Sequence, residues 1–245
     1  MIVLNGFEQG TAEWAEARRG IATASCVSKI ITPAKGELSS QARDYACQLI
    51  AESVVPPHYW IEAPDLNSPF VNHGITTEAE ALKYFVFETG KHIRKVGFVK
   101  SDCGRFGCSP DALVLPAPDE KPSEGLELKC PAHKTHVKYL LDGGLPVEYR
   151  PQVHASLVVT GLARWNFMSY AIGLPPLIVT VEPDEYTEKV RKGLLAFWEM
   201  YQELKARIGV KDYAPPERRE HPTVWGPDVD DKANELFSLN ATVEA

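Results

Sequence analysis

Two short apolar runs, separated by a polar loop, constrain the fold of this chain more than any other feature of its sequence. They cover residues 111–115 and 126–130, and Pro or Gly residues bound both of them. Runs of this length with such boundaries are typical of adjacent β-strands joined by a turn. The sequence therefore predicts a pair of neighbouring strands in the middle of the chain.

The second predicted strand carries charge on one face. Successive side chains of a strand point to opposite faces, so Glu127 and Lys129 share one face, while Leu126 and Leu128 share the other. Asp111, at the start of the first strand, brings a second carboxylate to the same region. Adjacent carboxylates repel each other unless a proton or a cation lies between them, and hard oxygen ligands of this kind suit Mg²⁺ or Mn²⁺. Spacing alone leaves two interpretations open, a metal site and a surface hairpin with solvated charges.

The length and composition favour one large domain with an extension. A chain of 245 residues with 44% hydrophobic side chains can bury a sizeable core. We expect residues 1–210 to form a single domain. Residues 211–245 contain clustered prolines and eight acidic against four basic side chains, which predicts an acidic, Pro-rich C-terminal extension.

The formal net charge of −7 argues at first against a nucleic-acid partner. More than half of this charge comes from residues 211–245, so the remainder is compatible with a basic groove on an acidic scaffold. The N-terminal residues do not resemble a signal peptide, and no apolar run approaches membrane-spanning length. We therefore expect a cytoplasmic protein with no membrane segment.

The five cysteines contain no close C-x-x-C pair, and no fourth ligand for a zinc or iron–sulfur centre is evident. We expect them to be buried free thiols in a reducing cytosol. They are Cys26, Cys47, Cys103, Cys108 and Cys130.

Helical and strand-like periods alternate along the chain. Predicted helices cover residues 11–19, 39–55, 77–89, 134–141, 148–159 and 184–208. Predicted strands cover residues 93–99, 106–109, 111–115, 126–130, 165–171 and 177–181. Residues 56–72 are expected to form a long loop. This order predicts an α/β (α+β) fold with a central mixed β-sheet flanked by helices.

Two predicted helix starts bear on function. Thr77 with Glu80 makes a capping box, which places Glu78 in the first turn of its helix. Thr23 or Ser25 is expected to cap a further helix that reaches Ile31. Free N–H groups at a helix N-terminus attract phosphate, and Arg18 and Arg19 precede this predicted helix. The alternative, a capped helix with surface arginines that bind no phosphate, remains open.

Five motifs together resemble the phage lambda exonuclease and YqaJ-type alkaline exonuclease family of the PD-(D/E)xK nuclease superfamily. They are Arg-Arg-Gly-Ile-Ala-Thr-Ala-Ser at 18–25, Gly-Ile-Thr-Thr-Glu at 74–78, Cys-Ser-Pro-Asp at 108–111, Gly-Leu-Glu-Leu-Lys-Cys-Pro at 125–131 and Tyr-Arg-Pro-Gln-Val at 149–153. They occur in the order of the family and at similar spacings. The resemblance covers about residues 8–208.

The resemblance implies a PD-(D/E)xK restriction-endonuclease-like core and a metal-dependent, processive 5′→3′ exonuclease. Such an enzyme degrades one strand of linear double-stranded DNA from 5′-phosphorylated ends and leaves 3′ single-stranded tails. It also implies a ring-shaped homotrimer, a phage-type single-strand annealing protein as partner in recombination, and a phage or prophage origin in a bacterial cytosol. A PD-(D/E)xK endonuclease of restriction or repair type, and a non-catalytic DNA-binding protein on the same fold, remain alternatives.

The matching positions also imply a metal site. Asp111 and Glu127 would hold Mg²⁺ or Mn²⁺, as two ions per site, aided by the backbone carbonyl of Leu128. A metal pair of this kind activates water and stabilises the charge that develops on a phosphodiester. Lys129 would orient or deprotonate the attacking water.

Four further positions receive roles from the resemblance. Glu78 would support the metal site, and Gln152 would contact the water or the scissile phosphate. Arg18 with Ser25 would bind the terminal 5′-phosphate, where arginine offers a bidentate fork.

Three matches to the family are weaker, and their contributions stay open. An additional family acid falls near Asp102 with an offset of about one residue. His154 replaces the second glutamine of the family's Q-x-Q motif. Phe70 or Val71 lies where the family has an apolar wedge.

Overall fold

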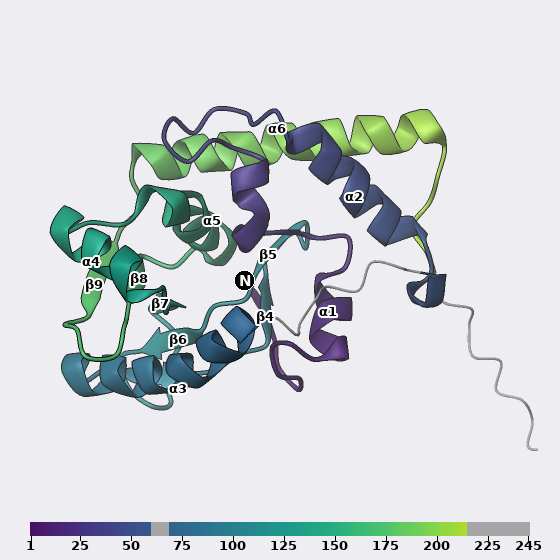
Figure 1. Cartoon of the computed structure of the whole chain (residues 1–245). Coiled ribbons are helices and arrows are strands. Elements are labelled where there is room, and N and C mark those ends of the chain that lie inside the picture. The colour runs from purple at the N-terminus through teal and green to yellow at the C-terminus, as the bar shows by residue number, and fades with distance from the viewer. Residues whose placement is uncertain (60–68, 215–245) are drawn as a thin grey trace, which may run out of the picture. The chain divides into compact units, whose positions relative to one another are not determined.

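The strands of this computed structural model form two mixed sheets in the part of the chain that it describes, residues 1–59 and 69–214 (Figure 1). Of residues 58 and 69–76 only the backbone is described. The smaller sheet has the order β1-β4-β5-β2, formed by Ile2–Leu4, Phe98–Lys100, Phe106–Cys108 and Ala22–Thr23. The larger sheet has the order β3-β6-β7-β8-β9, formed by His92–Arg94, Ala112–Leu115, Glu124–Lys129, Arg164–Ser169 and Leu177–Val181.

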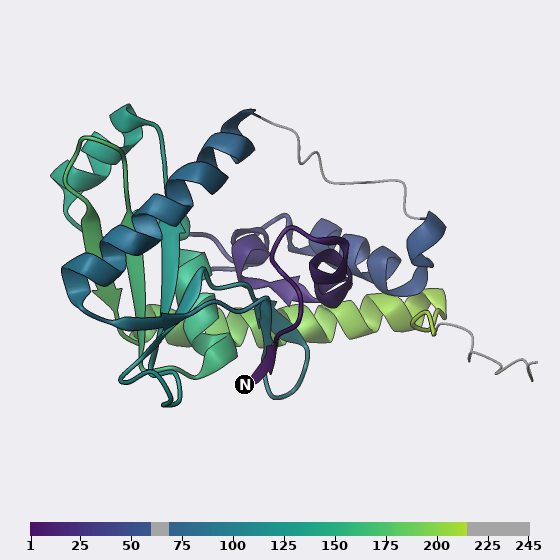
Figure 2. The same cartoon turned by 90° about the horizontal axis from the view of Figure 1, so that it is seen from below.

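Helices cover both faces of the larger sheet. The α-helices are α1 Ala12–Arg18, α2 Ala42–Val54, α3 Pro69–Thr89, α4 His133–Asp142, α5 Arg150–Thr160 and α6 Glu185–Ile208. Three short 3₁₀ helices are η1 Ala24–Lys29, η2 Pro57–Tyr59 and η3 Val147–Tyr149. Helix α3 packs against β7 from one side, and α5 packs against β7 and β8 from the other (Figures 1 and 2). The predicted fold class, mixed sheet flanked by helices, is confirmed, although the strands divide between two sheets.

The alternation along β7 explains this arrangement. Leu126 and Leu128 point toward α3 and pack in a cluster with Phe85. On the opposite face of the sheet, Trp165 and Phe167 of β8 pack in the cluster that includes residues of α5. Each layer buries apolar surface, which is the dominant favourable contribution to folding.

A close approach between strands requires one of the glycines. Gly125 of β7 pairs with Trp165 of β8, and a Cβ atom built at Gly125 would lie 2.3 Å from the indole ring. The absent side chain therefore leaves the space that the fully buried Trp165 fills.

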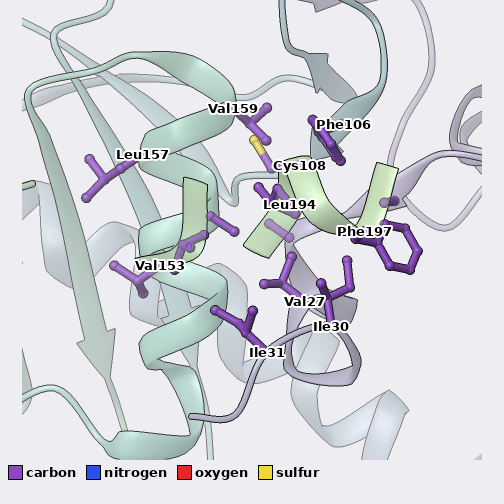
Figure 3. Close-up of a cluster of buried hydrophobic side chains, with 14 of the residues drawn as sticks. Val27, Ile30, Ile31, Phe106, Cys108, Val153, Leu157, Val159, Leu194 and Phe197 are labelled. Atoms are coloured by element: carbon purple, nitrogen blue, oxygen red, sulfur yellow. The ribbon is translucent and has the colours of Figure 1, made fainter. Parts of the chain in front are cut away.

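A second cluster holds the N-terminal third of the chain against α5 and α6. In Figure 3, Val27 and Ile30 of the η1 region face Val153 of α5 and Phe197 of α6. Helix α6 begins at Asp184, which forms a capping box with Thr187. This packing determines where the residues just before η1, including Arg18, lie relative to the sheet.

The predicted strand 93–99 is wrong. Residues 92–94 pair with β6 of the larger sheet, whereas residues 98–100 pair with β1 and β5 of the smaller one. The chain changes sheets at Gly97, where a Cβ atom would lie 2.6 Å from the ring of Phe7. This close approach is a tertiary contact that the local pattern does not encode.

One of the two functionally relevant helix starts is also wrong. Helix α3 begins at Pro69, so Thr77 is a buried residue inside it and Glu78 is not in its first turn. Proline is well tolerated in a first helical turn because its missing N–H is not needed there. Part of the predicted loop 56–72 is therefore helical, and its residues 60–68 lie outside the described part. The other start lies where the sequence predicted it: Thr23 is the N-cap residue of η1. This helix is a six-residue 3₁₀ helix that ends at Lys29, short of Ile31, and no side chain caps it.

The cysteines are free thiols, but they are not all buried. Cys108 is buried, Cys26 and Cys130 are partly buried, and Cys47 and Cys103 are exposed. The expectation of buried thiols is thus wrong for most of them, because the exposed two lie on α2 and in a surface turn.

The residues Met1–Tyr213 form one compact unit. The predicted division into a domain of residues 1–210 and an extension of residues 211–245 stays a prediction, since residues 215–245 lie outside the described part. Among the described helices, none is both long and apolar enough to cross a membrane.

Candidate active site

The hairpin of β6 and β7 brings two carboxylates together. Its antiparallel register pairs Ala112 with Leu126, and Asp111 directly precedes Ala112 while Glu127 directly follows Leu126. The backbone N–H of Asp111 donates to the carbonyl of Leu126 at 3.0 Å. The Oδ2 atom of Asp111 in turn accepts a hydrogen bond of 2.5 Å from the N–H of Leu128. This bond holds the Asp111 carboxylate at the backbone of β7, next to Glu127.

The Glu127 carboxylate is buried and held from two sides. Its Oε1 atom accepts hydrogen bonds from Nζ of Lys129 and from Nε2 of Gln152, each at 2.5 Å. Gln152 lies in the first turn of α5, which begins with Arg150 and Pro151. Both donors use Oε1, and within the described residues Oε2 accepts no hydrogen bond, so this oxygen is available to a cation.

The negative charges around Asp111 and Glu127 outweigh the positive charge of Lys129. Burial raises the pKa of Asp111 well above its usual range, and the charges of Glu127 and Glu78 raise it further, although Lys129 opposes them. Burial alone would lower the pKa of Lys129, but the carboxylates of Glu127 and Asp111 outweigh that effect and raise it. Lys129 is therefore an ammonium ion at neutral pH.

Glu78 is a third acid near the pair. Helix α3 packs against β7, and the charge of Glu78 acts on Asp111 as described above. Burial raises the pKa of Cys130 to about 11, and the charges of Glu78 and Asp111 contribute to that increase. The structure thus brings Glu78 close to the site even though its predicted place in the helix was wrong.

These side chains fit a divalent metal ion by their chemistry. Asp111, Glu127 and Glu78 supply hard oxygen donors and three negative charges, against one positive charge from Lys129. A proton or a cation between the carboxylates stabilises a partly buried cluster of this kind. Among the side chains that the structure describes, no three His, Cys, Asp or Glu residues are grouped closely enough to hold an ion by themselves. An ion here would need backbone or water ligands as well, as Mg²⁺ commonly does.

A second cluster lies beside the first. The Arg18 guanidinium donates from Nη1 to Oγ of Ser109 at 3.3 Å and from Nη2 to Oγ of Ser25 at 3.4 Å. Its Cζ atom lies 3.9 Å from the centre of the Trp14 ring, and Trp14 donates from Nε1 to Ser109 at 2.9 Å. Burial lowers the pKa of Arg18, and the charge of Glu52 is among those that oppose this decrease. The structure brings the two predicted phosphate-binding residues, Arg18 and Ser25, together.

Ser25 belongs to the first turn of the 3₁₀ helix η1, whose N-cap residue is Thr23. The hydrogen bonds that hold Arg18 in this cluster come from side chains. A role for the helix end in phosphate binding stays a prediction.

Ser109 is the residue that the sequence interpretation missed. It stands two residues before Asp111, in the connection between β5 and β6. That spacing within the Cys-Ser-Pro-Asp motif was the available signal. The contacts of Ser109 with Trp14 and Arg18 appear only when α1 packs beside the strand.

The weaker matches lie elsewhere or outside the described part. Asp102 is exposed and pairs with the amino group of Met1 at 2.5 Å. His154 is buried on α5 and binds Oγ1 of Thr187 through Nδ1 at 2.8 Å. The side chains of Phe70 and Val71 lie outside the described residues.

Comparison with known proteins identifies the family of the chain. The family model for the YqaJ-like viral recombinase domain matches residues 13–163, which is more than half of the chain. No curated protein sequence matches the chain.

Solved structures of exonucleases share the fold of this chain. The alkaline exonuclease LHK-Exo from Laribacter hongkongensis shares 26% identity over 81% of this chain and 96% of its own, with a TM-score of 0.67. Its complex with dAMP shows 25% identity with the same coverage and TM-score. A phage-related exonuclease from Haemophilus somnus 129PT, 13% identical over 77% of this chain and 96% of its own, has a TM-score of 0.56 and shows the fold alone.

The fold is thus that of the PD-(D/E)xK-type exonucleases, as the motifs predicted. The chain belongs to the family of YqaJ-like viral recombinase domains, to which the lambda exonuclease and alkaline exonuclease resemblance pointed.

Proposed function

We propose that this protein is a metal-dependent 5′→3′ exonuclease that degrades one strand of linear double-stranded DNA from 5′-phosphorylated ends. The family and the similarity to an alkaline exonuclease support a nuclease that acts in recombination. The 3′ single-stranded tails left by this reaction would be the substrate of strand annealing.

One observation carries the proposal. Ser109 accepts a hydrogen bond from Arg18 and stands two residues before Asp111, in the short connection between β5 and β6, so the chain links the cationic cluster directly to the acidic cluster. A cationic pocket next to a metal site can hold a terminal phosphate while the bond that follows it is hydrolysed. An internal phosphodiester, flanked by nucleotides on both sides, does not fit such an arrangement as well.

The chain's own residues would position the reacting groups. Asp111 and Glu127, with the carbonyl of Leu128 and support from Glu78, would hold Mg²⁺ or Mn²⁺, as one or two ions. The bound metal would activate water and stabilise negative charge on the phosphate.

The Lys129 ammonium would orient the attacking water and offset charge that develops on the phosphate. It is unsuited to act as a strong base, because its raised pKa keeps it protonated. Gln152, which donates to Glu127, would hold that carboxylate in place and orient the water or the scissile phosphate.

Directionality would come from the Arg18 cluster. An arginine provides charge-assisted hydrogen bonds to a phosphate, and Ser25 and Ser109 add two hydroxyl groups next to it. A terminal phosphate carries more charge than an internal diester, so it gains more from this pocket.

One experiment tests the proposed function directly. A linear duplex labelled at either the 5′ or the 3′ end, with or without a 5′-phosphate, is incubated with the protein in Mg²⁺ or in EDTA. We expect Mg²⁺-dependent release of nucleotides from the 5′-phosphorylated strand. Cutting of covalently closed circular DNA would instead support an endonuclease, and binding without any hydrolysis would support a non-catalytic DNA-binding protein.

The assembly is proposed on the same family basis. We expect a ring-shaped homotrimer in a bacterial cytosol, encoded by a phage or prophage, with a phage-type single-strand annealing protein as partner. Light scattering on the purified protein would give a mass about three times that of the 27.2 kDa chain. A monomer mass under assay conditions would contradict the ring.

A further inference from the structure

The aromatic ring of Tyr149 lies next to the ammonium group of Lys129, and no step described above uses this contact. The Nζ atom of Lys129 is 5.4 Å from the centre of the ring. The face of an aromatic ring attracts a cation within about 6 Å of its centre. Tyr149 is also the N-cap residue of α5, three residues before Gln152.

The ring itself is held by neighbouring aromatic side chains. Phe167 of β8, which is fully buried, packs against it with ring centres 5.3 Å apart. Tyr139 of α4 meets it edge-on at 6.3 Å and donates its hydroxyl to Oε1 of Glu148 at 2.5 Å. Strand β8, helix α4 and the start of α5 thus all constrain the position of the Tyr149 ring.

Lys129 is therefore held by two different kinds of contact. Glu127 binds the ammonium through a hydrogen bond of 2.5 Å, and Tyr149 attracts it through the ring. A ring attracts the cation as a whole without requiring one particular N–H group. The remaining N–H groups of Lys129 stay available to a water molecule or a phosphate oxygen, while the long flexible side chain loses alternative rotamers.

We propose that Tyr149 is a positioning residue for the exonuclease reaction, and that its ring keeps the Lys129 ammonium where it orients the attacking water. This inference rests on the proposed function. The hydroxyl of Tyr149 has no part in it, since the ring face makes the contact.

The test compares two substitutions at this position on a 5′-phosphorylated linear duplex. Tyr149→Phe keeps the ring, and Tyr149→Leu removes it. We expect Tyr149→Leu to lower kcat about tenfold, the loss of one partly desolvated cation–π contact. KM and the DNA affinity measured in EDTA stay unchanged, and Tyr149→Phe keeps kcat within about twofold of the wild type.

Helix α6 offers a matched control. The Nζ atom of Lys205 lies 5.6 Å from the ring centre of Tyr201, in the same type of contact but in another part of the fold. Tyr201→Leu is expected to lower the melting temperature and to leave kcat unchanged. Melting curves of all variants show whether each is folded at the assay temperature, and Tyr149→Met replaces Tyr149→Leu if the latter is not.

A double-mutant cycle separates positioning from general packing. In a Lys129→Ala background, Tyr149→Leu should change the remaining kcat by less than about twofold, because the ring then has no ammonium to hold. Equal losses for Tyr149→Phe and Tyr149→Leu, or a full tenfold loss without Lys129, would overturn the inference and leave the proposed function intact. A wild-type protein without metal-dependent hydrolysis would overturn both.

Discussion

Arg18 donates a hydrogen bond of 3.3 Å to the hydroxyl of Ser109, although 91 positions separate the two residues in the sequence. Ser109 lies in the motif that ends in Asp111, so this one contact connects a cationic cluster on α1 with an acidic cluster on β6 and β7. We propose that the two clusters are parts of a single site.

Replacing Arg18 tests the phosphate pocket. Arg18→Ala is expected to slow degradation of 5′-phosphorylated ends by about 10- to 100-fold, the loss of charge-assisted hydrogen bonds to a phosphate. Degradation from 5′-hydroxyl ends should change far less, because those ends offer no terminal phosphate. Initial rates on the two substrates, measured side by side, give the ratio. Equal losses on both would remove the pocket assignment.

Replacing Lys129 tests the role of its charge. Lys129→Ala is expected to lower turnover by about a hundredfold or more, as for other electrostatic groups that act on a developing charge. DNA affinity in EDTA should be retained, because Lys129 is turned toward Glu127. Lys192→Ala, an exposed lysine on α6, is the control and should keep both properties. Loss of DNA binding in Lys129→Ala would assign the residue to substrate affinity.

Metal binding can be measured without any nuclease assay. Titration with Mn²⁺ or Mg²⁺ should raise the melting temperature of the wild type, since the ion relieves repulsion between Asp111 and Glu127 and binds only the folded site. Asp111→Asn should abolish this increase as well as activity. In EDTA it should melt at the same temperature as the wild type or higher, because one of two repelling charges is gone.

Asp119→Asn provides the comparison for that experiment. Asp119 is exposed in the loop between β6 and β7, so its charge has no role in the site. Its variant should keep the full metal-induced increase in melting temperature. An Asp111→Asn protein that still responds to the metal like the wild type would place the ion elsewhere.

The pH dependence of stability should report on His154. Burial lowers the pKa of His154. The charge of Asp184, the N-cap residue of α6, opposes this decrease, and the charge of Arg150, on the same helix as His154, adds to it. Thr187 faces the ring as a neutral partner. Because the folded-state pKa lies below the unfolded value of about 6.5, the unfolded chain binds more protons as the pH falls below that value, and stability decreases.

The measurement is a series of melting temperatures between about pH 8 and pH 5, where unmodified histidines titrate. His154→Gln, which cannot be protonated there, should lose less stability toward acid than the wild type. His92→Gln, at an exposed position on β3, should follow the wild-type curve. Parallel curves for wild type and His154→Gln would show that His154 carries no such dependence.

The amino-acid sequence by itself determined the parts of this protein that depend on local pattern. Two-residue alternation at Leu126–Lys129 predicted which side chains share a face, and the hydrogen bond from the Leu128 N–H to Asp111 places the two acids close together as expected. The helical repeat of residues 184–208 likewise predicted α6 almost to its ends. Motif resemblance identified the family because its residues and spacings are retained.

Only the tertiary structure decided the remaining features, because they depend on contacts between distant segments. The break between β3 and β4 follows from Gly97 packing against Phe7, and the start of α3 at Pro69 moved Glu78 away from the helix end without moving it away from the acids. The partners of Ser109 and the aromatic ring beside Lys129 come from α1 and from the start of α5. No periodic pattern within a strand encodes what packs against it from elsewhere in the chain, and that is why these contacts became visible only in the folded protein.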